Sequence, residues 1–116
     1  DYARKTLQTF SDEIKNMPLG HTFMLTALDF DLGPTFNIVL VGEHSDNDTN
    51  TMLAAIRKKY LPNMTVKILK PENSKTIITG TGFEKIDGKT TAYVCKNQTC
   101  MPPTNNVEKM LSYLVI

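Results

Sequence analysis

Two cysteines are the residues of this chain whose type and spacing most directly suggest chemistry. Cys95 and Cys100 are its only cysteines, and four residues separate them in TAYVCKNQTC. They could form a thiol–disulfide couple, supply half of a zinc site, or serve as structural thiols. The thioredoxin-type motif has only two intervening residues and lowers a thiol pKa at a helix N-terminus, so this spacing does not match it.

We therefore expect two reduced, structural cysteines, because free Cys is among the most buried residue types. Cys95 ends a predicted strand and should be buried, whereas Cys100 follows a polar turn and should be the more accessible thiol. A redox pair is the alternative. A small disulfide would need the turn at Asn97-Gln98 to bring the two sulfurs together.

A zinc site is the third interpretation of the cysteines. Structural zinc usually has four protein ligands, and two thiolates leave two positions open. His21 and His44 are the only histidines, and nothing in their spacing groups them with the cysteines. We predict neither a metal site nor a cofactor.

The second candidate for chemistry is a polar loop that contains Gly42, Glu43, His44 and Asp46. It follows a predicted strand, and ligands of open α/β sheets bind outside the carboxyl ends of strands. An acid, a histidine and a second acid could do acid–base work. However, Gly42 stands alone without a glycine-rich phosphate motif. We favour a solvated connection that caps the next helix, with Asp48 as the expected cap, and keep a ligand loop as the alternative.

The elements that must position these residues begin with two predicted helices. The first has an apolar stripe, and Pro18 breaks it. The second, from about 19 to 32, is apolar around most of its circumference, which indicates burial on more than one side and neighbours outside this chain. We predict a helical hairpin over 1–34 and a small α/β domain over 35–116. The stripe of the first helix consists of Ala3, Leu7, Phe10, Ile14 and Met17.

The second domain reads as strand, helix, strand, which is the pattern of a βαβ unit. The strands are expected at 37–42 and 65–69, with the first covered on both faces because it is an unbroken apolar run. A third strand is expected at 90–95, preceded by a short extended piece at 76–78 and a tight turn at Asp87-Gly88. Asn105 should cap a last helix. The predicted class is α/β, with a small βαβ-based sheet and a C-terminal helix.

Composition excludes some partners. The chain has 13 basic and 12 acidic residues, whereas nucleic-acid affinity comes from clustered Lys and Arg. No apolar run approaches the ~20 residues of a membrane span. We therefore predict no nucleic-acid or membrane partner, and a cytoplasmic location. The chain also lacks an initiator Met, and we expect it to come from a longer protein.

Several sequence words resemble the C-terminal region of the spermatogenesis-associated thioredoxin-domain family, whose members carry an N-terminal thioredoxin-like domain followed by an α/α barrel. The resemblance implies that the first two helices end the helical barrel, and that the thioredoxin-like domain lies outside this chain. The words are Ala27-Leu28-Asp29-Phe30, Leu32-Gly33-Pro34, Ile38-Val39-Leu40-Val41-Gly42, Tyr60-Leu61-Pro62-Asn63, Asp87 to Cys95, and Thr99-Cys100.

The function expected for this chain is therefore structural: it closes and packs against the barrel, with no chemistry of its own and no enzyme activity alone. Its partner would be the rest of its own polypeptide, and the isolated chain would expose an apolar patch or self-associate. One alternative is a thiol–disulfide accessory role for Cys95 and Cys100. The other is a part in a sugar-processing barrel enzyme, because the barrel is similar to those of sugar epimerases and glycosidases.

Overall fold

The computed structural model describes residues 2–71 and 82–115. The chain divides into two compact units, Asp1–Thr35 and Phe36–Ile116, which we call the helical unit and the sheet unit. The predicted extended piece at 76–78 lies outside the described residues. None of the described helices is long and apolar enough to cross a bilayer.

The helical unit contains α1 (Tyr2–Thr9), α2 (Ser11–Asn16), a 3-10 turn (Pro18–His21) and α3 (Thr22–Leu32). The predicted first helix is thus two short helices that are separated at Phe10. Ile14 N nevertheless donates a hydrogen bond of 2.9 Å to Phe10 O, which is the i to i−4 pattern of an α-helix. The second helix starts three residues later than predicted because residues 18–21 wind as a 3-10 turn. It ends as predicted, at Gly33, which has a positive φ of 71°.

Little of the helical unit is buried. Ile14 is the only buried side chain among its described residues, and none of the 11 residues of α3 is buried. Phe23 of α3 is 90% exposed. An ion pair ties α1 to α3, with Arg4 Nη2 2.8 Å from Asp31 Oδ1. The broad apolar surface predicted for the second helix is therefore left uncovered by the described residues of this chain.

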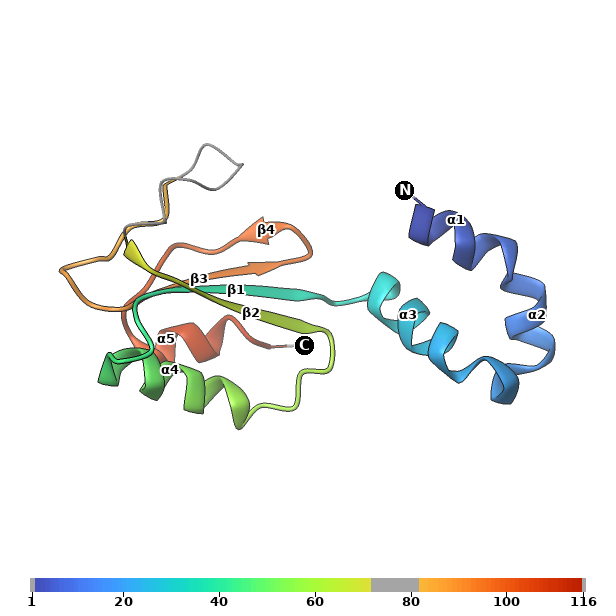
Figure 1. Cartoon of the computed structure of the whole chain (residues 1–116), viewed down its shortest axis with the longest axis horizontal. Helices are drawn as coiled ribbons and strands as arrows, with labels where there is room; N and C mark the ends of the chain where they lie inside the picture. Colours follow the sequence, from blue (N-terminus) through green and yellow to red (C-terminus); the bar gives the residue numbers. More distant parts are fainter. Residues whose placement is uncertain (1, 72–81, 116) are drawn as a thin grey trace. The chain divides into compact units, whose positions relative to one another are not determined.

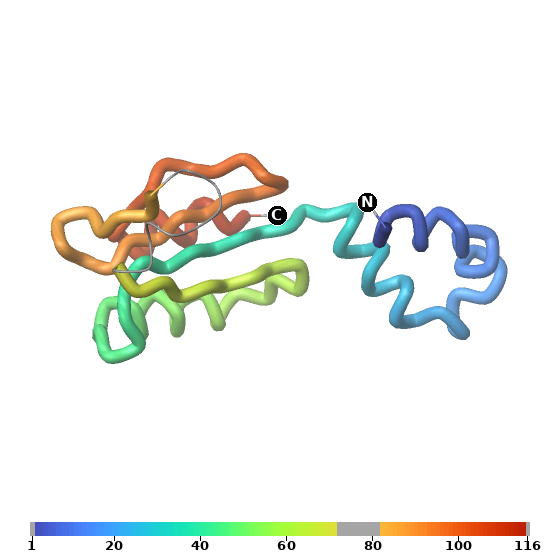
Figure 2. The backbone as a smooth tube through the Cα atoms, turned by 45° about the horizontal axis from the view of Figure 1, so that its top comes forward, coloured from blue at the N-terminus to red at the C-terminus, as the bar shows by residue number. Residues whose placement is uncertain are grey.

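The sheet unit is a four-stranded mixed sheet in the order β2-β1-β3-β4 (Figure 1). The strand β1 (Phe36–Val41) pairs parallel with β2 (Met64–Leu69) and antiparallel with β3 (Thr91–Lys96), which in turn pairs with the two-residue β4 (Thr99–Cys100). The helix α4 (Asn47–Arg57) connects β1 to β2, and α5 (Val107–Ser112) follows β4. The predicted α/β class is confirmed, including the βαβ unit; the tube in Figure 2 traces the same strands side by side.

Both helices cover the same face of the sheet, where the core lies (Figure 1). On the opposite face Asn37 and Thr65 are exposed, and the Thr65 hydroxyl donates a hydrogen bond of 2.6 Å to Asn37 Oδ1. The prediction that the first strand is covered on both faces holds only at its end. On the face opposite the helices, Asn37 is exposed and Val39 is half-buried, whereas Val41 is fully buried. The core consists of Phe36, Ile38, Leu40, Met52, Ile56, Ala92, Val94, Met110 and Leu114.

Two local predictions had different outcomes. The tight turn at Asp87-Gly88 is confirmed: both residues have positive φ, and Lys89 N donates to Ile86 O at 3.0 Å. The cap of the last helix is Asn106 rather than Asn105, because Asn106 Oδ1 accepts a hydrogen bond of 2.8 Å from Lys109 N. Both positions carry Asn, and the sequence alone does not distinguish them.

Lys96, the last residue of β3, contacts both ends of the sheet unit. Its Nζ donates a hydrogen bond of 2.7 Å to the carbonyl of Val115. The same Nζ lies 5.6 Å from the ring centroid of Phe36, a cation–π contact. The start of β1 and the end of the described chain therefore meet at one side chain.

Candidate functional site

The predicted ligand loop begins at Gly42, where a close approach of side chains requires glycine. Gly42 N donates to Leu69 O at 2.9 Å and so extends the pairing of β1 with β2. A Cβ added here would collide with the hydroxyl of Thr49 and would lie 2.8 Å from that of Thr90. These two hydroxyls are buried and hydrogen-bonded to each other at 2.8 Å. The glycine therefore has a packing reason, and no phosphate is needed to explain it.

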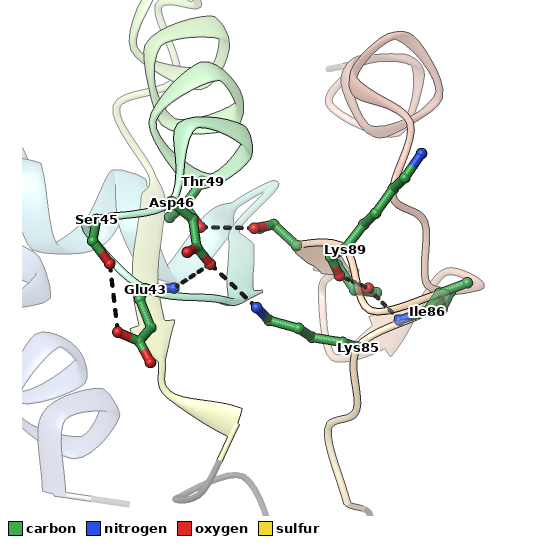
Figure 3. A network of polar contacts seen from close by, with 9 residues as sticks. Glu43, Ser45, Asp46, Thr49, Lys85, Ile86 and Lys89 are labelled. Carbon is green, nitrogen blue, oxygen red and sulfur yellow. Dashed lines mark hydrogen bonds and ion pairs between the residues drawn. The ribbon is translucent and has the colours of Figure 1, made fainter.

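Asp46 organises the rest of the loop (Figure 3). One of its carboxylate oxygens, Oδ2, accepts a hydrogen bond of 3.1 Å from Glu43 N and another of 3.1 Å from Lys85 Nζ. The backbone hydrogen bond from Glu43, followed by the one from Lys85, lowers the pKa of Asp46. The structure thus holds Asp46 as a carboxylate that fixes the loop.

The cap of α4 differs from the prediction. Asp46 occupies the N-cap position, but its side chain makes no capping hydrogen bond to the helix, because it is engaged with Glu43 and Lys85. Asp48 lies in the first turn of α4, so the prediction of Asp48 as the cap is wrong. An acid there still interacts favourably with the positive end of the helix dipole.

The structure places the acid–base candidates on two sides of the loop. His44 lines a cavity of about 440 Å³ together with Arg57 of α4 and residues of β2. Asp46 lines a different cavity of about 280 Å³, together with Lys85 and Lys89. Glu43 accepts a hydrogen bond of 3.5 Å from the Ser45 hydroxyl. His44 and Asp46 therefore line two different cavities.

Sequence reasoning missed Lys85 as a partner of this loop. It lies 39 residues from Asp46, in a glycine-containing segment with little periodicity. The signal available was the Asp87-Gly88 turn, which folds the preceding residues back along β3. At Glu84 both backbone groups hydrogen-bond the hydroxyl of Tyr93, with distances of 3.0 and 2.9 Å.

Cys95 and Cys100 are joined by a disulfide. The expectation of two reduced thiols is therefore wrong for this structure. The two residues lie directly opposite each other in the pairing of β3 with β4, and their Cα atoms are 3.8 Å apart. Asn97 and Gln98 form the turn with φ of 48° and 70°, which aligns the two cysteines. Cys100 is the more exposed of the two, as expected, but Cys95 is half-buried rather than buried.

The helical unit contains an apolar cavity. A groove of about 690 Å³ runs between α1 and α3. Arg4 and Asp31, which form the ion pair, also line it. Its apolar lining comes from Ala3, Leu7, Phe23, Met24, Ala27 and Phe30.

Within residues 2–71 and 82–115, no three or more His, Cys, Asp or Glu residues are grouped as metal ligands would be. His21 lies with its Nδ1 2.9 Å from the carbonyl of Met17.

The chain is similar to spermatogenesis-associated protein 20 from three mammals. It is 26% identical to the Homo sapiens protein over 101 residues, which is 84% of this chain. The corresponding identities are 25% for Rattus norvegicus and 24% for Mus musculus, each over 107 residues and 88% of this chain. The chain spans only 13–14% of the length of these relatives. No family model and no solved structure matches it. The resemblance noted in the sequence is thereby confirmed, and it is a resemblance to part of a larger protein.

Proposed function

We propose that this chain is a docking module of a longer polypeptide, in which the helical unit packs against further helices and closes the end of a helical barrel. The observation that carries the proposal is α3, an apolar helix with no buried residue. Phe23 and Leu32 of this helix are 90% and 75% exposed. Burying one such side chain contributes about 1.5–3 kcal/mol, so leaving them in water is costly.

The groove between α1 and α3 supports the same proposal. It is lined mainly by apolar side chains from both helices, including Leu7, Phe23 and Phe30. Large exposed apolar patches on soluble proteins mark interaction sites. The resemblance to a family with an α/α barrel suggests which partner would fill the groove, namely helices of the same polypeptide.

Light scattering and binding of a hydrophobic dye test the docking surface. The chain should self-associate or bind the dye, and the variant Phe23→Gln with Leu32→Gln should do so much less. Tyr60→Gln is the matched control, because Tyr60 is 88% exposed but belongs to the sheet unit. A clean monomer that binds no dye would count against the docking module.

A second candidate function is a thiol–disulfide accessory role, which the bond between Cys95 and Cys100 favours. By the family resemblance, the thioredoxin-like domain of the longer polypeptide would be its partner. A thiol count on the folded chain with and without reductant tests it: two thiols should appear only with reductant. A sugar-processing role stays a prediction about the rest of the barrel, whose pocket, by the family resemblance, would lie mostly outside this chain.

A further inference from the structure

The two sulfurs of the disulfide differ in their accessibility to an incoming thiolate. Cys100 is exposed at the end of the short edge strand β4, whereas Cys95 is half-buried within β3. Between them Asn97, Gln98 and Thr99 are all exposed, so the turn leaves the hairpin tip open to solvent. Exchange depends on which sulfur the attacking thiolate can reach.

We propose that Cys95–Cys100 is a reversible exchange site for an external dithiol, with Cys100 as the sulfur that is attacked and Cys95 as the resolving cysteine. This inference rests on the second proposed function and specifies its substrate class and direction. A dithiol is the fitting reductant because the neighbouring Cys95 would expel a monothiol by re-forming the disulfide.

The reaction balances as two successive exchanges. A thiolate of the dithiol attacks Cys100 Sγ, the bond between Cys95 and Cys100 breaks, and Cys95 leaves as a thiolate that takes up a proton. The second thiol of the dithiol, as a thiolate, then attacks the reductant's sulfur that is bonded to Cys100 Sγ, and Cys100 leaves as a thiolate. The cysteine pair gains two electrons, and the dithiol is oxidised to its disulfide.

The hairpin can return to the disulfide because other bonds hold its strands in place. Met101 N donates to Val94 O at 2.8 Å, directly beyond the cysteine pair. Further along, Ala92 and Thr104 exchange two backbone hydrogen bonds of 2.7 and 3.0 Å. The two thiols should therefore stay opposite each other after reduction, ready for reoxidation.

The test combines a redox titration with a trapping experiment. The folded chain is equilibrated in dithiothreitol buffers of graded potential, alkylated and weighed, while circular dichroism monitors the fold. In parallel, Cys95→Ser and Cys100→Ser are each reacted with glutathione disulfide. Cys95→Ser, which retains Cys100, should react at least about tenfold faster, equal to about 1.4 kcal/mol in activation free energy.

The wild-type chain provides a measurement that does not depend on how the variants fold. After a short pulse of glutathione, rapid alkylation of the freed cysteine thiol prevents that thiol from expelling the glutathione, and the trapped adduct of the wild type should lie on Cys100. Adducts mainly on Cys95, in a chain that is reduced while folded, would overturn the assigned direction and leave the thiol–disulfide role standing. A disulfide that resists dithiothreitol until the chain unfolds would overturn both the assigned direction of attack and the thiol–disulfide role.

Discussion

The hydroxyls of Thr49 and Thr90 lie 2.8 Å apart and are shielded from solvent, with exposures of 0% and 2%. Thr49 belongs to α4 and Thr90 directly precedes β3, so this hydrogen bond ties the helix to the third strand. Each hydroxyl is the hydrogen-bond partner of the other. Their removal should therefore show strong coupling.

Replacing either threonine by valine should lower the free energy of unfolding by about 1–3 kcal/mol, because the remaining hydroxyl is left buried without a partner. The double variant Thr49→Val with Thr90→Val should cost less than the sum of the two, since it leaves no orphan group. Urea unfolding of the four proteins measures this coupling. Strictly additive losses would contradict the buried pair.

The acid sensitivity of the sheet unit should depend on Asp46. The fold lowers the pKa of Asp46 below its unfolded value of about 3.9, so its contribution is fully present above that pH and is lost as the pH falls through the folded pKa. Asp46→Asn should therefore flatten the loss of thermal stability below about pH 4. Thermal unfolding between neutral and acidic pH measures the difference.

Asp48→Asn is the control for this experiment. It removes one negative charge from the same turn but leaves both hydrogen bonds of Asp46 in place. Its stability profile in acid should change less than that of Asp46→Asn, because only the weak interaction of Asp48 with the helix dipole is lost. Added salt should weaken the contribution of the Asp46–Lys85 pair, whose side chains are partly exposed. An acid profile unchanged in Asp46→Asn would show that this carboxylate does not organise the loop.

Tyr93 should hold the segment before the Asp87-Gly88 turn. Its ring contacts Phe83 edge-on, with centroids 4.8 Å apart, and its hydroxyl bonds both backbone groups of Glu84. Tyr93→Phe keeps the ring and removes both hydrogen bonds, so the stability should fall by about 1 kcal/mol. Amide hydrogen exchange at Glu84 should accelerate. Tyr60→Phe, at an exposed tyrosine, should leave both unchanged; unaltered protection of Glu84 in Tyr93→Phe would refute the role.

The disulfide should contribute modestly to stability. Its loop is short, with a sequence separation of 5, and chain entropy gives about 2 kcal/mol for such a closure. Cys95→Ala with Cys100→Ala should lose about this amount in urea unfolding, and reduced wild type should unfold near the same midpoint. A much larger loss would mean that the bond is required for folding and would argue against reversible exchange.

The sequence predicted the parts of the fold that repeat a pattern. The strands at β1, β2 and β3 were placed within a residue or two, because β-branched runs between turn signals are characteristic of strands. The Asp87-Gly88 turn was found because its residues tolerate positive φ. Which strands pair, and in which register, could not be predicted, since register depends on contacts between residues distant along the chain.

The candidate sites show the same limit. That Cys95 and Cys100 face each other depends on a positive φ at both Asn97 and Gln98. Such a φ is uncommon for residues other than glycine, so the sequence offered this turn, and with it the disulfide, only as an alternative. Lys85, which binds Asp46, is 39 residues away from it in the sequence, so no local pattern links the two. The acid–base interpretation of the loop relied on neighbours in sequence. In the structure, a hydrogen bond of 3.0 Å from Asp46 N to Glu43 O closes a turn, and Asp46 and His44 line different cavities.

The two contacts of Lys96 have a consequence for how the sheet unit can be built into other chains. Phe36 and Val115 both meet this lysine, so the polypeptide enters and leaves the unit at one point. A unit with adjacent ends can be inserted into a loop of a host protein without stretching it. It can also be circularly permuted, with a short linker that joins residue 115 to 36 and new ends at the exposed Asp87-Gly88 turn.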